Sequence, residues 1–273
     1  MTMLILTLRA EPRQRIDAAP LTPEHLQGRS ADEIGDILLQ TGNRQLRAGD
    51  LFDIQGDDAS HLVLRGATGK LDCIGRGMTQ GQITVEGDAG SYLGMQMKGG
   101  RIDVHGSIDA YGACELKNGH IIVQGNAGHF LGASLPGNKK GMAGGVVIVR
   151  GNVGDRAGDH LRRGAILIEG NAGDYLGSRM TAGTIAVLGK TGRYLGYAMG
   201  RGTLLLAQPP TEIMPTFNDC GTHTLGFIPL LLKSFADLDT PFAGMSEPLK
   251  RVRRYAGCMS SLGKGEILIA ADA

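Results

Sequence analysis

The stretch from Gln82 to Gly94, QITVEGDAGSYLG, contains the two features that decide the fold. Its first five residues alternate between polar and apolar, and glycine follows at Gly87, Gly90 and Gly94. Alternation with a period of two is typical of a β-strand that buries one face. Glycines at fixed positions after a strand are typical of tight turns or of close contacts between backbones. The stretch therefore predicts a strand followed by a compact turn.

This pattern recurs along the chain at a spacing of 19 residues, and once at 26. A glycine precedes each strand, in the column Gly81, Gly100, Gly119, Gly145, Gly164, Gly183 and Gly202. The predicted strands are 82–86, 101–105, 120–124, 146–150, 165–169 and 184–188. A fixed period of this kind is the signature of a solenoid, in which each repeat stacks on the one before it. We predict an all-β fold, a right-handed parallel β-helix of about seven coils with small α/β caps at both ends.

Structural glycines form the motif GxxGxxxG after five of the strands. They are Gly87, Gly90, Gly94, Gly125, Gly128, Gly132, Gly151, Gly154, Gly158, Gly170, Gly173, Gly177, Gly189, Gly192 and Gly196. The coil that starts at Gly106 departs from the motif, with Asp109 and Ala113 in the last two places. The long coil has seven extra residues within 133–141 (ASLPGNKKG), which predict a surface loop because they are polar and turn-forming.

A column of Met or Leu stands three residues before the glycine that precedes each strand. We interpret this column as a core ladder, since flexible apolar side chains fill a narrow interior well. The alternative, a metal or cofactor site, has less support. The members are Met78, Met97, Leu116, Met142, Leu161, Met180 and Met199.

The chain divides into an N-terminal cover at 1–60, the glycine repeat at 61–208 and a C-terminal tail at 209–273. The cover begins with an apolar stretch, 1–8, that predicts a strand. A helix is expected to begin at Pro23, and a second at the capping box Ser30–Glu33, with Gly42 as its C-cap. The tail predicts a helix at 227–238 and strands at 251–258 and 266–269, packed on the coils or on a partner.

Composition excludes several classes of protein. Lys and Arg number 28 against 27 Asp and Glu, so the chain is not a strongly basic nucleic-acid binder. The four cysteines lie far apart, which argues against a zinc ribbon, an iron–sulfur site or a disulfide framework. No apolar run approaches the ~20 residues of a membrane span. We expect a soluble, cytoplasmic protein with neither nucleic-acid nor membrane partners.

Motifs for chemistry are weak. Gly189-Lys190-Thr191 follows Gly183 by six residues where a P-loop requires five, and no GxGxxG follows a strand and opens a helix. The densest polar cluster outside the repeat contains Asp219, Cys220 and His223, but a CxxH pair has too few ligands for a metal, and Asn-Asp-x-Gly is typical of a turn. We therefore predict no catalytic, cofactor-binding or metal-binding residue, and keep these three only as weak candidates.

The outward column in the middle of the strands changes from polar to apolar along the stack. It begins with Thr84 and Asp103, which should face water. A contiguous apolar ladder on a surface indicates an interface. We predict that the ladder is covered by the tail or by a partner subunit, and its large members, the interface candidates, are Ile122, Ile148, Leu167 and Leu205.

An aromatic column follows the second glycine of the motif: Tyr92, Tyr111, Phe130, Tyr175 and Tyr194, with Arg156 in one coil. Stacked aromatic side chains bind sugars or bases in some proteins, but on a solenoid they more often stabilise the stack or an interface. Whether the aromatic residue or the adjacent leucine points inward stays open at this point.

The glycine repeat over 66–206 resembles the β-helical C-terminal domain of the glutamate synthase large subunit. It is still more similar to the C subunits of formylmethanofuran dehydrogenase and of the related formyltransferase/hydrolase complex of methylotrophs. The tail segment NDCGTHTLGFIP (218–229) favours the second complex.

The resemblance implies a non-catalytic scaffold subunit of a one-carbon enzyme that transfers a formyl group between tetrahydromethanopterin and a methanofuran-type carrier and releases formate. It implies an amidohydrolase-like subunit, a formyltransferase subunit and a third subunit as partners, and no cofactor in this chain. Two alternatives stay open: the C subunit of a molybdenum or tungsten formylmethanofuran dehydrogenase, and a free-standing β-helix enzyme with a groove. The second is disfavoured because outward residues such as Glu86, His105 and Gln124 change type from coil to coil.

Overall fold

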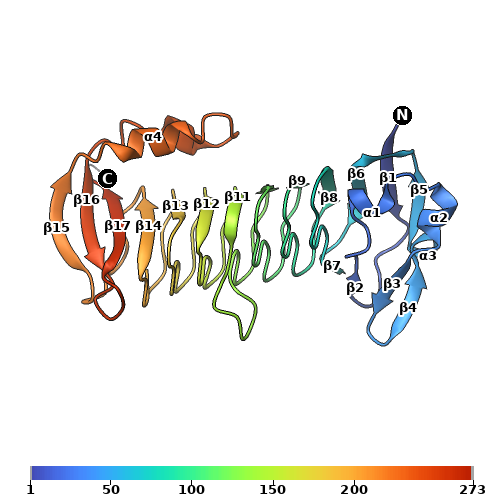
Figure 1. Cartoon of the computed structure of the whole chain (residues 1–273), viewed down its shortest axis with the longest axis horizontal. Coiled ribbons are helices and arrows are strands. Elements are labelled where there is room, and N and C mark those ends of the chain that lie inside the picture. The colour runs from blue at the N-terminus through green and yellow to red at the C-terminus, as the bar shows by residue number, and fades with distance from the viewer. Residues whose placement is uncertain (1, 272–273) are drawn as a thin grey trace.

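The computed structural model describes residues 2–271 and consists mainly of β-strands (Figure 1). Within that range thirteen strands form one mixed sheet, in the order β15-β16-β17-β14-β13-β12-β11-β10-β9-β8-β6-β1-β5. The all-β class is therefore confirmed at the level of one large sheet. Its strands are β1 (Met3–Leu8), β5 (Phe52–Gln55), β6 (Asp58–Ala67), β8 (Gln82–Gly87), β9 (Arg101–Val104), β10 (His120–Val123), β11 (Ala143–Val149), β12 (Arg163–Ile168), β13 (Thr184–Val187), β14 (Arg201–Leu206), β15 (Asn218–His223), β16 (Val252–Gly257) and β17 (Lys264–Ala270).

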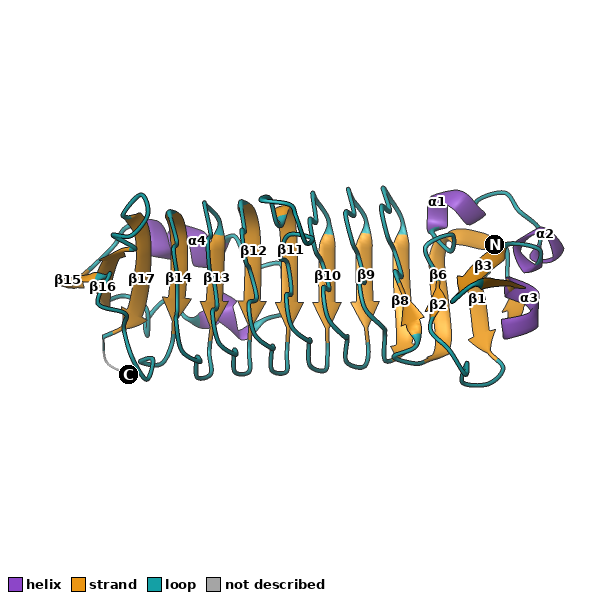
Figure 2. Ribbon diagram, turned by 90° about the horizontal axis from the view of Figure 1, so that it is seen from below, coloured by secondary structure: helices purple, strands orange, loops and turns teal. Residues whose placement is uncertain are grey.

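Each 19-residue repeat contributes one strand to this sheet, and consecutive strands from β8 to β14 pair in parallel (Figure 2). The register keeps equivalent positions opposite one another, so that Ile83 faces Ile102 and Ile102 faces Ile121. After each strand, one residue forms a second parallel bridge to the next repeat, from Ala89 and Ile108 onward to Thr191. The strands predicted from the period of two are confirmed, and each repeat stacks directly on its neighbour.

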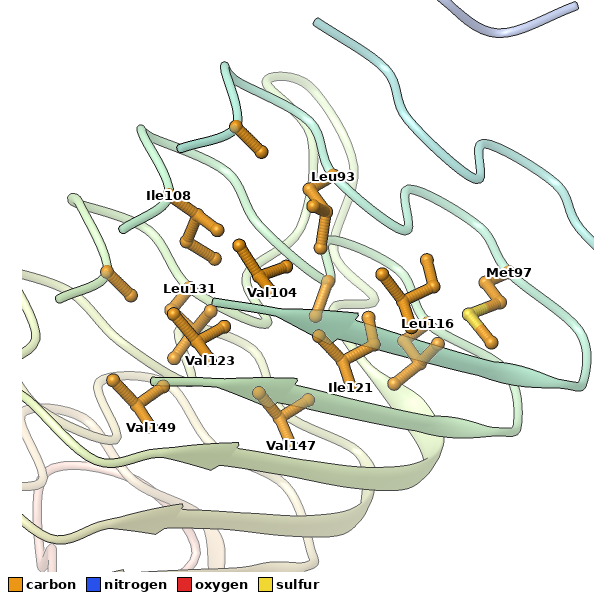
Figure 3. Close-up of a cluster of buried hydrophobic side chains, with 14 of the residues drawn as sticks. Leu93, Met97, Val104, Ile108, Leu116, Ile121, Val123, Leu131, Val147 and Val149 are labelled. Carbon is orange, nitrogen blue, oxygen red and sulfur yellow. The ribbon is translucent and has the colours of Figure 1, made fainter. Parts of the chain in front are cut away.

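The interior is a narrow apolar core. The second and fourth residues of the strands point into it, as Ile121 and Val123 do in Figure 3, and both are fully buried. The Met and Leu column lies beside them, and all seven members are fully buried, which confirms the core ladder. Leu93 and Leu131 also point inward and are fully buried. Their aromatic neighbours therefore face outward, which answers the question that the sequence left open.

The glycines of the motif are needed for two different physical reasons. At Gly170 a Cβ atom would lie 2.5 Å from the carbonyl oxygen of Gly151 in the preceding coil, so a side chain would force the two backbones apart. At Gly177 the backbone has φ +66°, a left-handed conformation that favours glycine. The first position of the motif thus permits close stacking, and the last permits the turn.

The 26-residue coil has the register that the sequence predicts. The amide of Met142 donates to the carbonyl of Gly132 (2.9 Å), as that of Met97 donates to Gly94 (3.2 Å) in an ordinary coil. The extra residues therefore leave the coil before Met142, and residues 136–140 are exposed. They form the loop that extends from the stack beside β11 in Figure 1.

The N-terminal cover contains helices α1 (Pro23–Leu26), α2 (Ala31–Gly35) and α3 (Ala48–Leu51). Its strands β2 (Ile16–Asp17), β3 (Leu38–Thr41) and β4 (Arg44–Arg47) form a small sheet with β7 (Leu71–Asp72), which belongs to the start of the next segment. The helix start at Pro23 is confirmed. So is the capping box, in which the amide of Ser30 donates to the carboxylate of Glu33 at 2.7 Å.

The expected C-cap at Gly42 is wrong. Helix α2 already ends at Gly35, and Gly42 lies in the turn between β3 and β4. The residues after the helix alternate between exposed and buried and pair with β4, so strand pairing ends the helix early.

The C-terminal tail extends the large sheet and then covers it. Strand β17 pairs in parallel with β14, and β16 and β15 follow as antiparallel neighbours. Between β15 and β16 the chain forms α4 (Phe227–Lys233) and the 3-10 helix η1 (Pro241–Gly244). Helix α4 and the residues after it lie over the outer face of the sheet above β14 to β11 (Figure 1).

Candidate functional site

The C-terminal half of the outer sheet face is closed by the chain itself. The interface candidates Ile122, Ile148, Leu167 and Leu205 are at most 5% exposed. They form one apolar cluster with side chains of the tail: Ile228, Leu232, Phe235, Phe242 and Leu249. Polar contacts hold the tail at the edge of this cluster: Arg150 donates to Asp239 (2.7 Å), and Thr240 donates to Glu169 (3.1 Å). In this structure the ladder is thus not a free surface.

The N-terminal half of the same face is polar and uncovered by the tail. Asp103 accepts hydrogen bonds from Arg101 (2.7 Å) and from Gln82 (3.0 Å), and Thr84 lies 2.9 Å from the His61 ring. Beside these strands runs a groove of about 610 Å³, with a floor of backbone at the glycines that precede the strands. Its lining residues are Ser60, His61, Gly81, Gln82, Gly99, Gly100, Arg101, Asn118, Gly119 and His120.

The weak candidates Asp219, Cys220 and His223 lie on β15, an edge strand of the large sheet. They do not form a nucleophile and base pair, because His223 Nε2 faces the backbone carbonyl of Cys220 (2.8 Å) and not the thiol. Asp219 is paired with Arg253, whose hydrogen bond lowers the pKa of this carboxyl group. The turn chemistry expected from Asn-Asp-x-Gly is present within this strand: the amide of Gly221, which has φ +80°, donates to the Asp219 carboxylate (2.9 Å), and the pairing register shifts between Asp219 and Thr222.

One polar cluster escaped the sequence analysis, because its members come from three coils. Asp159, whose side chain is 5% exposed, accepts from Ser178 (2.5 Å) and from both Nε and Nη2 of Arg179 (2.9 and 2.6 Å). Ser134 Oγ and Asp159 Oδ2 both lie 3.2 Å from Nδ1 of His160. The only sequence signal is a 19-residue spacing between Asp159 and Ser178.

This cluster contains Ser, His and Asp but does not have the geometry of a catalytic triad. A triad needs the serine on one ring nitrogen of the histidine and the carboxylate on the other. Here both groups face the same nitrogen, and the carboxylate is already held by Arg179. The arrangement suits an anchor that joins neighbouring coils.

The aromatic column forms a ladder on the outside of the stack. Ring centroids are 5.3 Å apart for Tyr92 and Tyr111, 4.7 Å for Tyr111 and Phe130, and 4.6 Å for Tyr175 and Tyr194. In the coil without an aromatic residue, the guanidinium of Arg156 lies 4.3 Å from the ring centroid of Tyr175. Because every ring is stacked on another ring or on a cation, the ladder stabilises the coils.

Among residues 2–271, no three His, Cys, Asp or Glu side chains meet in a way that could hold a metal ion. None of the helices in the same range has the length and hydropathy needed to span a bilayer. The polar groups described above mostly hydrogen-bond to one another.

Comparison of the sequence with known proteins matches one protein family and several individual proteins. Residues 62–220 match the GXGXG motif family. The chain is 39% identical to the C subunit of the formyltransferase/hydrolase complex Fhc of Methylorubrum extorquens, over 98% of this chain and 100% of that protein. It is 32% identical to the C subunit of tungsten-containing formylmethanofuran dehydrogenase 2 of Methanothermobacter thermautotrophicus, over 34% of this chain and 37% of that protein.

The fold is also similar to that of a solved structure. It matches a chain in the X-ray crystal structure of the formyltransferase/hydrolase complex (FhcABCD) from Methylorubrum extorquens in complex with methylofuran. The TM-score is 0.93 and the identity 38%, and the match covers 98% of this chain and 99% of the other. The likeness thus includes the cover and the tail as well as the glycine repeat.

Proposed function

Because the chain belongs to the family of C subunits of formyltransferase/hydrolase complexes, we propose that it is the non-catalytic scaffold subunit of such a complex. The observation that carries the proposal is the full-length match, 98% of this chain against 100% of the relative. The glycine repeat alone would support only the fold. The match of the cover and tail supports the same place in an assembly.

The proposed assembly transfers a formyl group between tetrahydromethanopterin and a methanofuran-type carrier, and releases formate. The chemistry belongs to its partners, an amidohydrolase-like subunit, a formyltransferase subunit and a third subunit, and the chain holds no cofactor. The geometry supports a structural role, since Asp159 and Asp219 are held by arginines and His223 does not contact the Cys220 thiol. The distant cysteines also support a cytoplasmic location.

A tungsten or molybdenum formylmethanofuran dehydrogenase is the weaker candidate. Its C subunit is similar to this chain over about a third of either sequence, whereas the formyltransferase/hydrolase relative matches from end to end. The free-standing β-helix enzyme has still less support, because the polar clusters of this chain lack the geometry of a nucleophile and base pair.

For the fold we propose a right-handed parallel β-helix, with 1–60 as a cover, 61–208 as the glycine-repeat coils and 209–273 as a tail packed on them. Two sets of parallel pairing support it: the strands of the large sheet, and the bridges between successive repeats from Ala89 to Thr191. Parallel strands joined by a crossover are right-handed in about 98% of cases. An experimental structure would test the handedness directly.

The test of the proposed function is to purify the full-length chain, with a C-terminal tag, from its own host. We expect three further subunits to co-elute, with formyl transfer and formate release in the eluate and none in the isolated chain. Metal analysis of the eluate separates the two complexes, since a dehydrogenase would carry molybdenum or tungsten. A chain that elutes alone, or that turns over substrate alone, would contradict the proposal.

A further inference from the structure

Six exposed cationic side chains come from four consecutive coils: four stand where the chain turns into the strands, and two stand on the loop of the 26-residue coil, whose ends contact Glu115 and His160. We call this surface the basic ridge; its members are Lys98, Lys117, Lys139, Lys140, Arg162 and Arg163. Backbone hydrogen bonds place them together, because the coils of Met97, Leu116, Met142 and Leu161 are consecutive. Three steps of ~4.8 Å separate the first coil from the last. Neighbouring coils are therefore closer than the Debye length of about 8 Å at physiological salt, so cations on adjacent coils repel one another, whereas the first and last coils are largely screened from each other.

The ridge carries little counter-charge: the charge of Lys117 helps to lower the pKa of Glu115, a carboxylate of the same coil segment. Among residues 2–271, none of the six forms an ion pair, although other lysines and arginines do so elsewhere. The two carboxylates of these coil segments, Glu115 and Asp159, are held by other donors. In a chain with 28 basic and 27 acidic residues, such a gathering costs folding stability through repulsion. Carboxylates supplied from outside the chain would offset this cost.

The loop that carries Lys139 and Lys140 is held in place at its base. Glu115 accepts from the amide of Leu135 (3.2 Å) and from the side chain of Asn138 (2.5 Å). Burial alone would raise the pKa of Glu115, but hydrogen bonds from Gln96, Asn138 and Leu135 lower it below its ordinary value, so the anchor is charged at neutral pH. On the other side, the amide of Gly141 donates to the carbonyl of His160 (3.0 Å).

An ordered protrusion loses little conformational freedom when it binds, which favours a specific contact. The groove described above borders the ridge, because its lining residues Gly99 and Asn118 directly follow Lys98 and Lys117. A raised loop and a groove side by side give the basic surface a definite shape.

From these observations we infer that the basic ridge is the docking surface for an acidic face of another subunit. The inference rests on the proposed function, which supplies the partner. A protein surface fits better than a nucleic acid for two reasons. The ridge is only about 15 Å long along the stack, as the strand spacing dictates. It also has no aromatic side chains among its cations, which single-stranded nucleic acids would use for stacking.

Charge reversal in the full-length chain tests the inference. One variant carries Lys139→Glu and Lys140→Glu, and a second carries Lys117→Glu and Arg162→Glu. The matched control carries Lys190→Glu and Arg193→Glu, which are also exposed and form no ion pair within residues 2–271, but lie at the corner after the strands. Each tagged variant replaces the native chain in the host, and the partner subunits retained after washing are quantified.

At ~0.15 M salt we expect both ridge variants to retain roughly a tenth of the partner that the wild type retains, or less, and the control to match the wild type. Raising the salt should release the partner from the wild type and leave little difference between the proteins. The melting temperatures of the isolated variants are compared with that of the wild type, so that loss of partner through a damaged fold is distinguished from loss of a contact.

Three results would overturn the inference. If the ridge variants retain their partners as well as the control does, the ridge is not the docking surface. If the wild type brings down nucleic acid that the ridge variants lose, the acidic partner is a nucleic acid and not a subunit. If the wild type brings down no subunits at all, the proposed function fails first and the ridge inference falls with it.

Discussion

Replacing Gly170 by alanine tests whether the coils stack as closely as the structure indicates. The backbone of Gly170 is not left-handed, so alanine meets no conformational penalty there. In a site with free space the change would stabilise the protein by roughly 0.4–1 kcal/mol, because it restricts the unfolded chain. Any loss of stability must therefore come from contact with the neighbouring coil.

The contact is severe and involves backbone atoms. The added Cβ would lie 2.5 Å from the oxygen and 2.6 Å from the carbon of the Gly151 carbonyl. The coils must separate to relieve it, which also lengthens the hydrogen bonds from the amides of Gly170 (3.2 Å) and Asn171 (2.9 Å) to the preceding coil. Overpacking costs about 1–3 kcal/mol, and each weakened hydrogen bond adds about 0.5–1.5 kcal/mol at most. We expect a net loss of about 2–4 kcal/mol.

The measurement is thermal unfolding of the isolated chain, followed by circular dichroism. For a chain of this size the melting temperature should fall by about 5–10 °C. The matched control is Gly69→Ala, since a Cβ there meets nothing within 4 Å and the backbone is again not left-handed. The control should melt at or slightly above the wild-type temperature. If the two variants melt alike, close approach of the coils is not what selects glycine at the first position of the motif.

Three further predictions concern the tail, the loop of the 26-residue coil and the cysteines. Ile148→Asp places a charge between the sheet and α4, so residues 224–250 should become sensitive to protease while the circular dichroism of the coils persists; loss of the whole fold would refute the proposed packing. Deleting residues 135–141 leaves two residues between Gly132 and Met142, as in an ordinary coil, and the melting temperature should change by less than about 4 °C. In the native chain a thiol reagent should modify exposed Cys220 and spare Cys73 and Cys114, because burial raises the pKa of both thiols to about 12; labelled peptides that contain Cys73 or Cys114 would contradict this.

Much of the fold could be predicted because the same sequence pattern recurs from coil to coil. The period of two and the glycine columns each recur in six or seven coils, so an accident in one coil, such as Ala113 in place of glycine, does not hide the pattern. The apolar ladder from Ile122 to Leu205 is recognisable for the same reason. The pattern alone could not say that the tail, and not a partner, lies on it in this structure.

The features that the sequence did not reveal depend on contacts between coils or on unusual backbone. Tyr92, Gln96 and Glu115 all have positive φ angles, between 53° and 63°, although they are not glycines. Stacked neighbours hold them there, and no local preference predicts it. The anchor at Asp159 joins side chains that are 19 to 26 residues apart in the sequence. The helix end predicted at Gly42 is wrong because the pairing of β3 with β4 cannot be recognised from the residues around Gly42 alone.

The covered ladder and the basic ridge predict different modes of assembly. An apolar interface is insensitive to salt, whereas a contact through the ridge weakens as salt rises. If the tail stays on the ladder in the complex, Ile148→Asp should expose the tail yet leave the salt-dependent capture of partners by the ridge intact. If the tail instead moves aside so that a partner binds the ladder, Ile148→Asp should abolish capture at every salt concentration, and the ridge variants should not. The two sets of variants, compared across salt concentrations, therefore decide which face holds the assembly together.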